Sequence, residues 1–181
     1  MKYKNWLIFF LISILLTISN TSNAASKEEI DEKVKESVKA FYAFSSAGER
    51  LSKKAFGMLV FPSIIKAGFV LGGEYGEGVL LSNGKTVDYY STASASVGWQ
   101  LGVEERSQVI LFMTKDAYEH FKRSEGWDVG VDGSVAITTF GTGKNFTVEN
   151  SKEPVIGFVF SQKGLMGNIS LEGSKISKIY K

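Results

Sequence analysis

The order of apolar and polar residues divides the chain into an apolar leader, an amphipathic segment and a long region of short apolar runs. In the leader, a basic start precedes a nearly continuous apolar core at 6–18, which is shorter than the roughly 20 residues that span a bilayer. Ser22 and Ala24 then fit positions −3 and −1 of a signal-peptidase site. We predict a signal peptide at 1–24 and, after cleavage near Ala24, a periplasmic or secreted protein. The alternative is an uncleaved membrane anchor.

Residues 27–44 follow a helical period, with charged side chains of both signs on one face. Ser26 and Glu29 have the spacing of a capping box, which marks the start of a helix. Two uses of the apolar face are open: packing on the domain, or insertion into a lipid headgroup layer. Packing is favoured because membrane-seeking helices usually carry a mainly basic polar face. The apolar face consists of Ile30, Val34, Val38 and Phe41.

Beyond residue 55 the pattern changes to short apolar runs separated by glycine, which predicts strands. Asn83-Gly84 between two runs is a strong hairpin signal, and Gly72–Gly78 is predicted to be a sharply turned segment. Thr114 is expected to cap a compact helix. The predicted strands are 56–61, 68–73, 78–81, 86–92, 95–101, 109–113, 129–139, 145–148, 155–161 and 168–171.

These elements indicate an α+β fold in one domain, residues 25–181. An N-terminal amphipathic helix packs on a strongly curved, largely antiparallel β-sheet, with one further short helix. Partial closure into a barrel would explain the many glycines, which permit bulges and tight bends. Gly68-Phe69-Val70 and Gly157-Phe158-Val159 are each followed by two glycines at matching distances. We therefore expect two similar hairpins at two corners of one sheet.

Charge and composition exclude several classes of protein. The chain has 21 Lys and Arg against 19 Asp and Glu, and the leader contributes two of the lysines, so the remainder is neutral. A nucleic-acid binder steered by bulk charge is therefore excluded. The chain has no cysteine, so the stability of an exported domain must come from packing.

Catalytic and metal-binding patterns are weak. His120 is the only histidine, and no Gly-x-Ser-x-Gly elbow accompanies it; with no cysteine, a zinc or copper site is disfavoured. Residues 128–133 resemble a calcium loop, but Thr139 stands where such a loop needs an acid. We predict no catalytic residue, no metal site and no cofactor, and therefore not an enzyme.

Several side chains are candidates for contact with lipid. Lysines near the run 56–61 would suit anionic phospholipid headgroups, although a solvated rim is the ordinary explanation. For Glu74, on the predicted turn, a solvated acid is likewise the ordinary explanation. The candidate lipid-binding residues are Lys53, Lys54, Lys66, Glu74, Tyr75, Val34, Val38 and Phe41.

Five motifs in order make the chain resemble the SYLF domain, also described as the yeast Ysc-type actin-binding domain. They are Ala55–Pro62, Lys66–Gly78, Ser94–Gly102, Val109–Met113 and Gly164–Gly173. The resemblance implies a lipid-binding module; eukaryotic members bind phosphoinositide membranes and, in fungi, actin filaments. An exported protein meets neither of these ligands, so the resemblance carries over only a general role at lipid surfaces.

Together these features predict an exported, non-enzymatic protein of the bacterial envelope that binds a lipid or a membrane surface. The expected partner is a phospholipid or another envelope lipid. The alternative is a periplasmic protein-interaction or scaffold module, whose partner would be an envelope protein.

Overall fold

The computed structural model describes residues 25–124, 126–137, 153–161, 164–165 and 171–181, with the backbone alone described at 68–71, 96–102 and 164–165. In this part of the chain three helices accompany seven strands of one sheet. The helices are α2 (Lys27–Phe44), α3 (Ser46–Ser52) and α4 (Lys115–Arg123). The strands are β1 (Gly57–Ser82), β2 (Lys85–Phe112), β3 (Gly126–Asp128), β4 (Ala136–Ile137), β5 (Val155–Ser161), β6 (Gly164–Leu165) and β7 (Lys175–Ile179).

One long hairpin, β1 with β2, is the centre of the sheet. Its two-residue turn is Asn83-Gly84, with φ of 51° and 72°, as the sequence predicts for a hairpin of this type. β2 pairs with β5 over 107–112 and with β7 over 89–93. Of the named strand pairs only β4–β5 is parallel, so the predicted α+β fold with a largely antiparallel sheet is confirmed.

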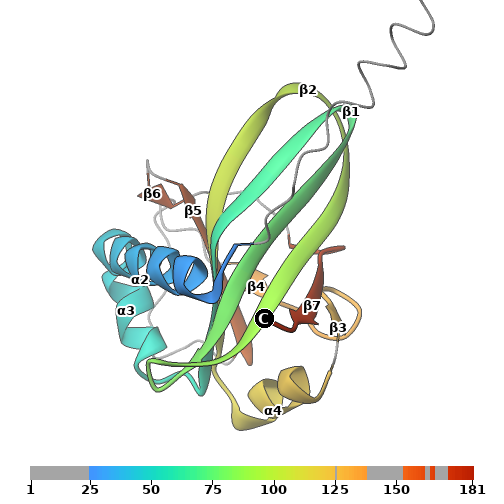
Figure 1. Cartoon of the computed structure of the whole chain (residues 1–181). Helices are drawn as coiled ribbons and strands as arrows, with labels where there is room; N and C mark the ends of the chain where they lie inside the picture. Colours follow the sequence, from blue (N-terminus) through green and yellow to red (C-terminus); the bar gives the residue numbers. More distant parts are fainter. Residues whose placement is uncertain (1–24, 125, 138–152, 162–163, 166–170) are drawn as a thin grey trace, which may run out of the picture.

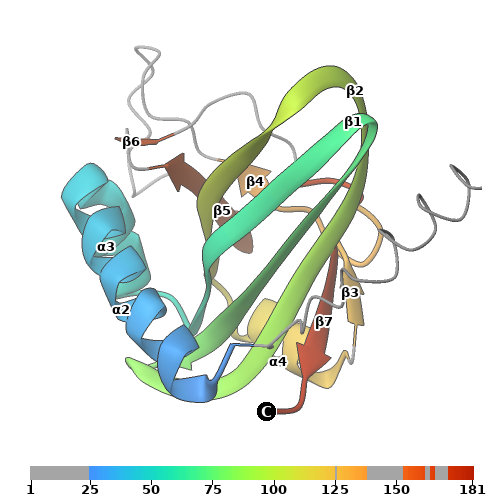
Figure 2. The same ribbon diagram turned by 45° about the horizontal axis from the view of Figure 1, so that its top comes forward.

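The long hairpin folds over on itself, so that the end with the turn packs against the open end (Figures 1 and 2). We call residues 57–67 with 103–112 half A, and residues 72–82 with 85–95 half B. The halves touch through backbone: a Cβ at Gly76 would lie 2.5 Å from the Ser63 carbonyl oxygen, and one at Gly78 would overlap the Val60 carbonyl. Glycine is required at both positions because any side chain would push the halves apart.

Two hydrophobic clusters hold this arrangement. Between the halves lie large side chains that α4 covers at the lower end of Figure 1. On the outer side of half A, α2 packs its apolar face against β1, β2 and β5. Each fully buried side chain of this size contributes about 1.5–3 kcal/mol. The first cluster includes Leu59, Phe61, Leu80, Tyr90, Phe112 and Phe121, and the second includes Ile30, Val34, Phe41, Val60, Leu111 and Phe158.

The helices begin where their caps predict. The Ser26 hydroxyl accepts the Glu29 amide at 3.1 Å, and the Thr114 hydroxyl accepts the Ala117 amide at 3.3 Å. The break between α2 and α3 falls at Ser45. Ser45 ends α2 and caps α3, its hydroxyl accepting the Gly48 amide at 2.9 Å.

The predicted turn at Gly72–Gly78 is wrong: this segment is continuous strand, paired residue by residue with β2. The predicted strands between 56 and 81 are pieces of β1, and those between 86 and 112 are pieces of β2. Glycine interrupts the apolar pattern there without interrupting the backbone pairing. The two Gly-Phe-Val copies therefore do not form matching hairpins, because only the second is followed directly by one, β5–β6.

The C-terminal predictions are met in part. β5 has the predicted bounds, whereas only residues 136–137 of the predicted strand 129–139 are strand in the described structure. Gly130, with φ of 95°, lies in a turn that interrupts that segment. The predicted strand 145–148 and most of 168–171 lie outside the described residues.

The crossing of the halves can be tested by adding a methyl group at Gly78. We expect Gly78→Ala to lower the free energy of unfolding by about 2–3 kcal/mol, because the group has no space against the Val60 carbonyl. Urea denaturation of residues 25–181 measures the difference. Gly73→Ala is the matched control in the same strand, since its Cβ would meet only the Ser94 carbonyl oxygen at 3.8 Å. Equal losses in both variants would contradict the proposed contact.

Candidate functional site

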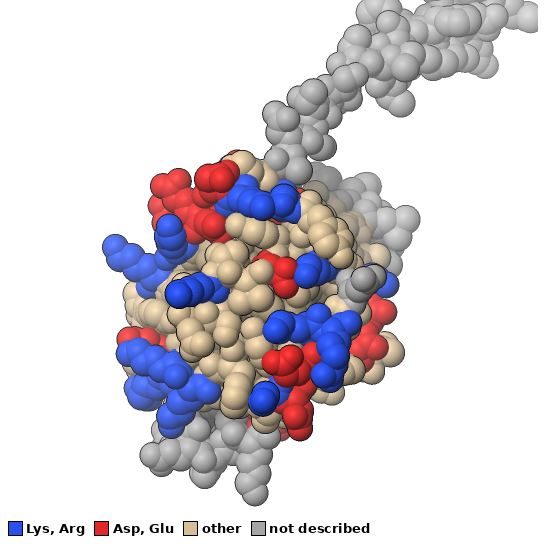
Figure 3. Space-filling model, turned by 60° about the horizontal axis from the view of Figure 1, so that its bottom comes forward, with Lys and Arg blue, Asp and Glu red and all other residues tan. Residues whose placement is uncertain are grey.

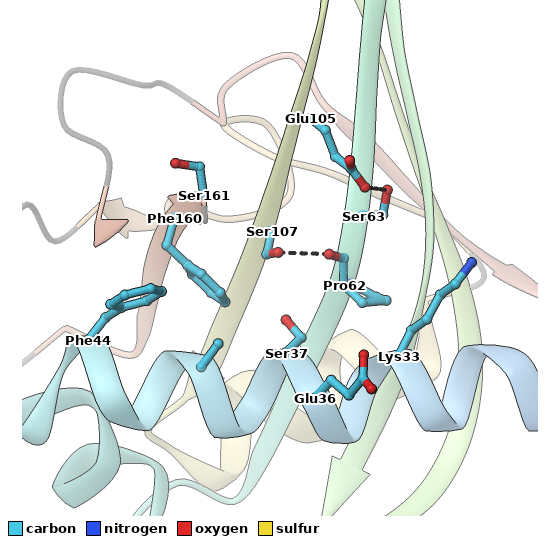
Figure 4. A pocket seen from close by; sticks show the side chains of 11 residues that line it. Lys33, Glu36, Ser37, Phe44, Pro62, Ser63, Glu105, Ser107, Phe160 and Ser161 are labelled. Carbon is cyan, nitrogen blue, oxygen red and sulfur yellow. Dashed lines mark hydrogen bonds between the residues drawn. The ribbon is translucent and has the colours of Figure 1, made fainter. Parts of the chain in front are cut away.

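A groove of about 460 Å³ lies between α2 and the outer side of half A (Figure 4). One wall is α2, and the floor comes from β1, β2 and β5, which are far apart in the sequence. This size is typical of sites for small molecules. It lies beside the contact between the apolar face of α2 and the sheet. One end of the groove is apolar and the other is polar.

The floor of the groove is shaped by a β-bulge at Pro62. Proline has no amide hydrogen to donate, so strands accept it at bulges and edges. The pairing of β1 with β2 shifts register between Phe61 and Ile64. The Ser107 hydroxyl donates to the Pro62 carbonyl at 2.7 Å and holds the bulge in place. The predicted strand 56–61 stops before Pro62, whereas β1 continues through it.

One end of the groove is apolar. The rings of Phe44 and Phe160 have centroids 6.1 Å apart, and Ala40 and Pro62 complete this end. Phe44 is partly exposed, whereas Phe160 is buried. An apolar wall that remains partly in contact with solvent is able to gain free energy by covering itself with a ligand.

The other end is polar and mainly acidic. The Ser63 hydroxyl donates to Glu105 at 2.6 Å, and Glu36 and Lys33 reach the groove from α2. The Lys33 ammonium is paired with Glu29 at 2.7 Å. This hydrogen bond raises the pKa of Lys33, and the negative charge of Glu105 adds to the increase.

Above the groove, the outer side of half A carries uncovered apolar residues. Side chains alternate between faces along a strand, and Ile65 pairs with Glu105 while Ala67 pairs with Val103. All four are therefore on the same outward face as the groove. Ile65 is 50% exposed and Val103 is 77% exposed. We call Ile65, Ala67 and Val103 the apolar patch.

The opposite, inward side of the same strands carries a buried ion pair between the two halves. Arg106 donates to both oxygens of Glu74, at 3.0 and 2.5 Å, and the two side chains are only 6% and 11% exposed. Burial opposes ionisation of Glu74, but the hydrogen bonds and charge of Arg106 outweigh it and lower the pKa of Glu74. Ser94 also donates to Glu74 at 3.2 Å.

Glu74 thus lies in a buried ion pair, whereas the sequence suggested a solvated turn. Of the other candidates near it, Lys66 lies 3.9 Å from Glu74, and the Tyr75 hydroxyl donates to Glu77 at 3.0 Å. Sequence reasoning missed Arg106. The alternation of side chains along the strand could have indicated it. Residues 110, 108 and 106 share one face of β2, and Ile110 is buried on the inward face.

The lysine candidates do not form one cluster. Lys53 and Lys54 follow α3, where Lys53 pairs with Glu49 at 2.7 Å. Lys66 is nine residues further along β1 than Gly57, which corresponds to roughly 30 Å of strand. On the lower face of the molecule, basic and acidic side chains are intermixed (Figure 3). The apolar candidates Val34 and Phe41 are buried under α2, and Val38 is partly buried.

Within the described ranges, the remaining motifs do not come together in a catalytic arrangement. His120 is exposed on α4. In the segment that resembles a calcium loop, Asp132 instead accepts the Asp128 amide at 2.6 Å. Among the described residues, no three acidic or histidine side chains come together as metal ligands. None of the described helices has the length and apolar character needed to span a bilayer.

Both a family model and curated relatives match this chain. A family model described as "Ysc84: Las17-binding protein actin regulator" matches residues 93–180. LAS seventeen-binding protein 3 of Saccharomyces cerevisiae, in strains YJM789 and S288c, is 29% identical over 131 residues. The chain belongs to the SYLF family. The match covers 68% of this SYLF chain and 28% of the yeast protein, so the chain spans little more than a quarter of these relatives.

The family match covers only part of the groove. Glu105, Ser107 and Phe160 lie within 93–180, whereas Pro62 and Ser63 of β1 and all of α2 precede that range. The SYLF identity that the motifs predicted is confirmed. In the groove, the β2 and β5 residues lie inside the matched segment, and the β1 and α2 residues lie outside it.

The buried ion pair gives a prediction about acid stability. Replacing Glu74 with glutamine leaves the Arg106 charge buried without its partner, so we expect a loss of about 3–5 kcal/mol at pH 7. Because the folded pKa of Glu74 lies below its ordinary value of 4.5, ionised Glu74 stabilises the fold above that pH. This contribution is lost as the pH falls through the folded pKa.

Urea unfolding between pH 7 and pH 3 tests this expectation. The difference between wild type and Glu74→Gln should shrink below about pH 4.5. Glu49→Gln is the control, because it removes the exposed pair with Lys53 and should leave stability almost unchanged. A gap between wild type and Glu74→Gln that stays constant with pH would show that the pair does not act as described.

Proposed function

We propose that this SYLF protein is an exported, non-enzymatic protein that binds lipid or a membrane surface through the apolar patch and the adjoining groove. The observation that carries the proposal is the uncovered outer side of half A, where Ile65 and Val103 face solvent. Where α2 covers this side of half A, the apolar side chains are buried against the helix. The exposed apolar side chains of this side are those that α2 does not cover. Contiguous exposed apolar surface marks interaction sites.

The rigid sheet makes this patch suited to a surface. Ile65 and Val103 come from paired strands, so their positions relative to each other are fixed by the ladder. Inserting such side chains below headgroups yields about 1.5–3 kcal/mol for each one fully removed from water. The buried apolar face of α2 takes part indirectly, by holding the helix against the sheet and leaving the groove beside it.

The family supports a binding role. The family model is described as an actin regulator, and the yeast relative is named for binding Las17. These names favour the second candidate, a protein-interaction module, for which the same apolar patch would be the contact surface. An envelope protein would then take the place of lipid as the partner.

Vesicle sedimentation decides between the two candidates. We expect residues 25–181, which contain every described element, to sediment with vesicles of phosphatidylethanolamine and phosphatidylglycerol. Val103→Glu should reduce the partition coefficient about tenfold or more, because a charge cannot be buried in the apolar layer. Val131→Glu is the matched control: Val131 is 84% exposed in a turn outside the patch.

Two results would overturn the lipid proposal. One is the absence of sedimentation from low to moderate salt. The other is equal loss of binding in Val103→Glu and Val131→Glu. Cross-linking to one envelope protein, abolished by Val103→Glu and with no lipid retained in native mass spectrometry, would establish the protein-interaction alternative instead.

A further inference from the structure

The groove has a chemical preference of its own, separate from the apolar patch. We propose that it binds single amphiphiles with a primary ammonium head, as in ethanolamine phospholipids, with the first part of the chain lying against Phe44 and Phe160. This inference rests on the proposed function and names the class of lipid. It is carried by the charges at one end of the groove and the aromatic rings at the other (Figure 4).

The balance of charge favours a cationic group. Glu36 and Glu105 line the polar end with one basic side chain, Lys33, which pairs with Glu29 at 2.7 Å and also interacts with the charge of Glu105. Within the described part of the chain, Glu36 forms no ion pair. The polar end therefore has an excess of negative charge. An ammonium group would lower the electrostatic energy of this end, whereas a head with net negative charge would raise it.

The hydrogen-bonding groups point the same way. Carboxylates are acceptors: Glu105 already accepts the Ser63 hydroxyl at 2.6 Å, and its remaining lone pairs and those of Glu36 can accept donors from a ligand. Ser37 lines the groove and is 7% exposed as a residue; its hydroxyl is directed toward the groove, but the oxygen is buried and has no hydrogen-bond partner among the described residues. A primary ammonium has three N–H donors, whereas a quaternary ammonium such as choline has none. The groove should therefore distinguish two heads of equal charge.

The volume sets the size of the ligand. A groove of about 460 Å³ falls in the lower part of the range for small-molecule sites. It therefore takes a headgroup with the beginning of one chain rather than a whole two-chain lipid. The remainder of the chain would extend along the outer side of half A, over the apolar patch that begins next to Ser63 and Glu105.

Titration with soluble lysophospholipids of one chain length tests the preference. We expect residues 25–181 to bind lysophosphatidylethanolamine at least tenfold more tightly than lysophosphatidylglycerol or lysophosphatidylcholine, measured by calorimetry below the critical micelle concentration. Glycerophosphoethanolamine, which lacks the chain, should bind more weakly than the lysolipid because it leaves the rings of Phe44 and Phe160 uncovered.

Variants locate the binding. Glu105→Gln and Glu36→Gln should each reduce the preference for the ethanolamine head, whereas Glu32→Gln, an exposed acid on the same helix outside the groove, should not. Ala40→Trp should fill the apolar end and abolish binding, with urea unfolding confirming that the variant is folded. Unchanged affinity in Ala40→Trp would overturn the proposal, as would equal affinity for the three lysolipids.

The result is separable from the membrane-surface proposal. Wild-type protein that sediments with vesicles but does not distinguish lysolipids would overturn the groove assignment and leave the patch as the contact surface. Tighter binding of a lysine-containing amphipathic peptide than of lysophosphatidylethanolamine would also overturn it, since the acidic end would then serve a protein side chain. Selective lysolipid binding without vesicle sedimentation would retain the groove and remove the surface role.

Discussion

The fold depends on the close crossing of the two halves of one hairpin. Gly76 and Gly78 let β1 pass so near its own earlier residues that no side chain fits between. This contact brings half B over half A, encloses the first hydrophobic cluster and places Glu74 beside Arg106. It also fixes which side of half A faces outward. The helix α2, the groove and the apolar patch all occupy that outward side.

A short run of β2 serves both sides of the sheet. Arg106 points inward to the ion pair, while its neighbours Glu105 and Ser107 point outward to the groove. Alternation along a strand makes this division unavoidable. A buried ion pair adds little net stability over an apolar pair, but it penalises arrangements that separate the charges. Arg106 and Glu74 therefore help to specify the folded-over hairpin, and through it the alignment of Glu105 with Ser63.

Local signals in the sequence predicted the local structure. The caps at Ser26 and Thr114, the Asn83-Gly84 turn and the SYLF motifs were all interpreted correctly. The folded-over hairpin was not, because glycine marks turns and close backbone contacts alike, and only long-range pairing separates them. The groove could not be predicted from the sequence either, because it depends on the angle at which α2 lies on three strands that are far apart in the sequence. The candidate lysines were near in sequence but separated by an extended strand.

Charge balance determines how such a protein would select a lipid. With basic and acidic residues equal over 25–181, and both signs mixed on the lower face, no strong long-range field draws the protein to an anionic surface. Selection must then come from groups in contact with the ligand. In the proposed site, the outer side of half A would supply two kinds: apolar side chains for the hydrocarbon part of a ligand, and the carboxylate of Glu105 for its headgroup. Their adjacency on one rigid sheet allows a single molecule to engage both.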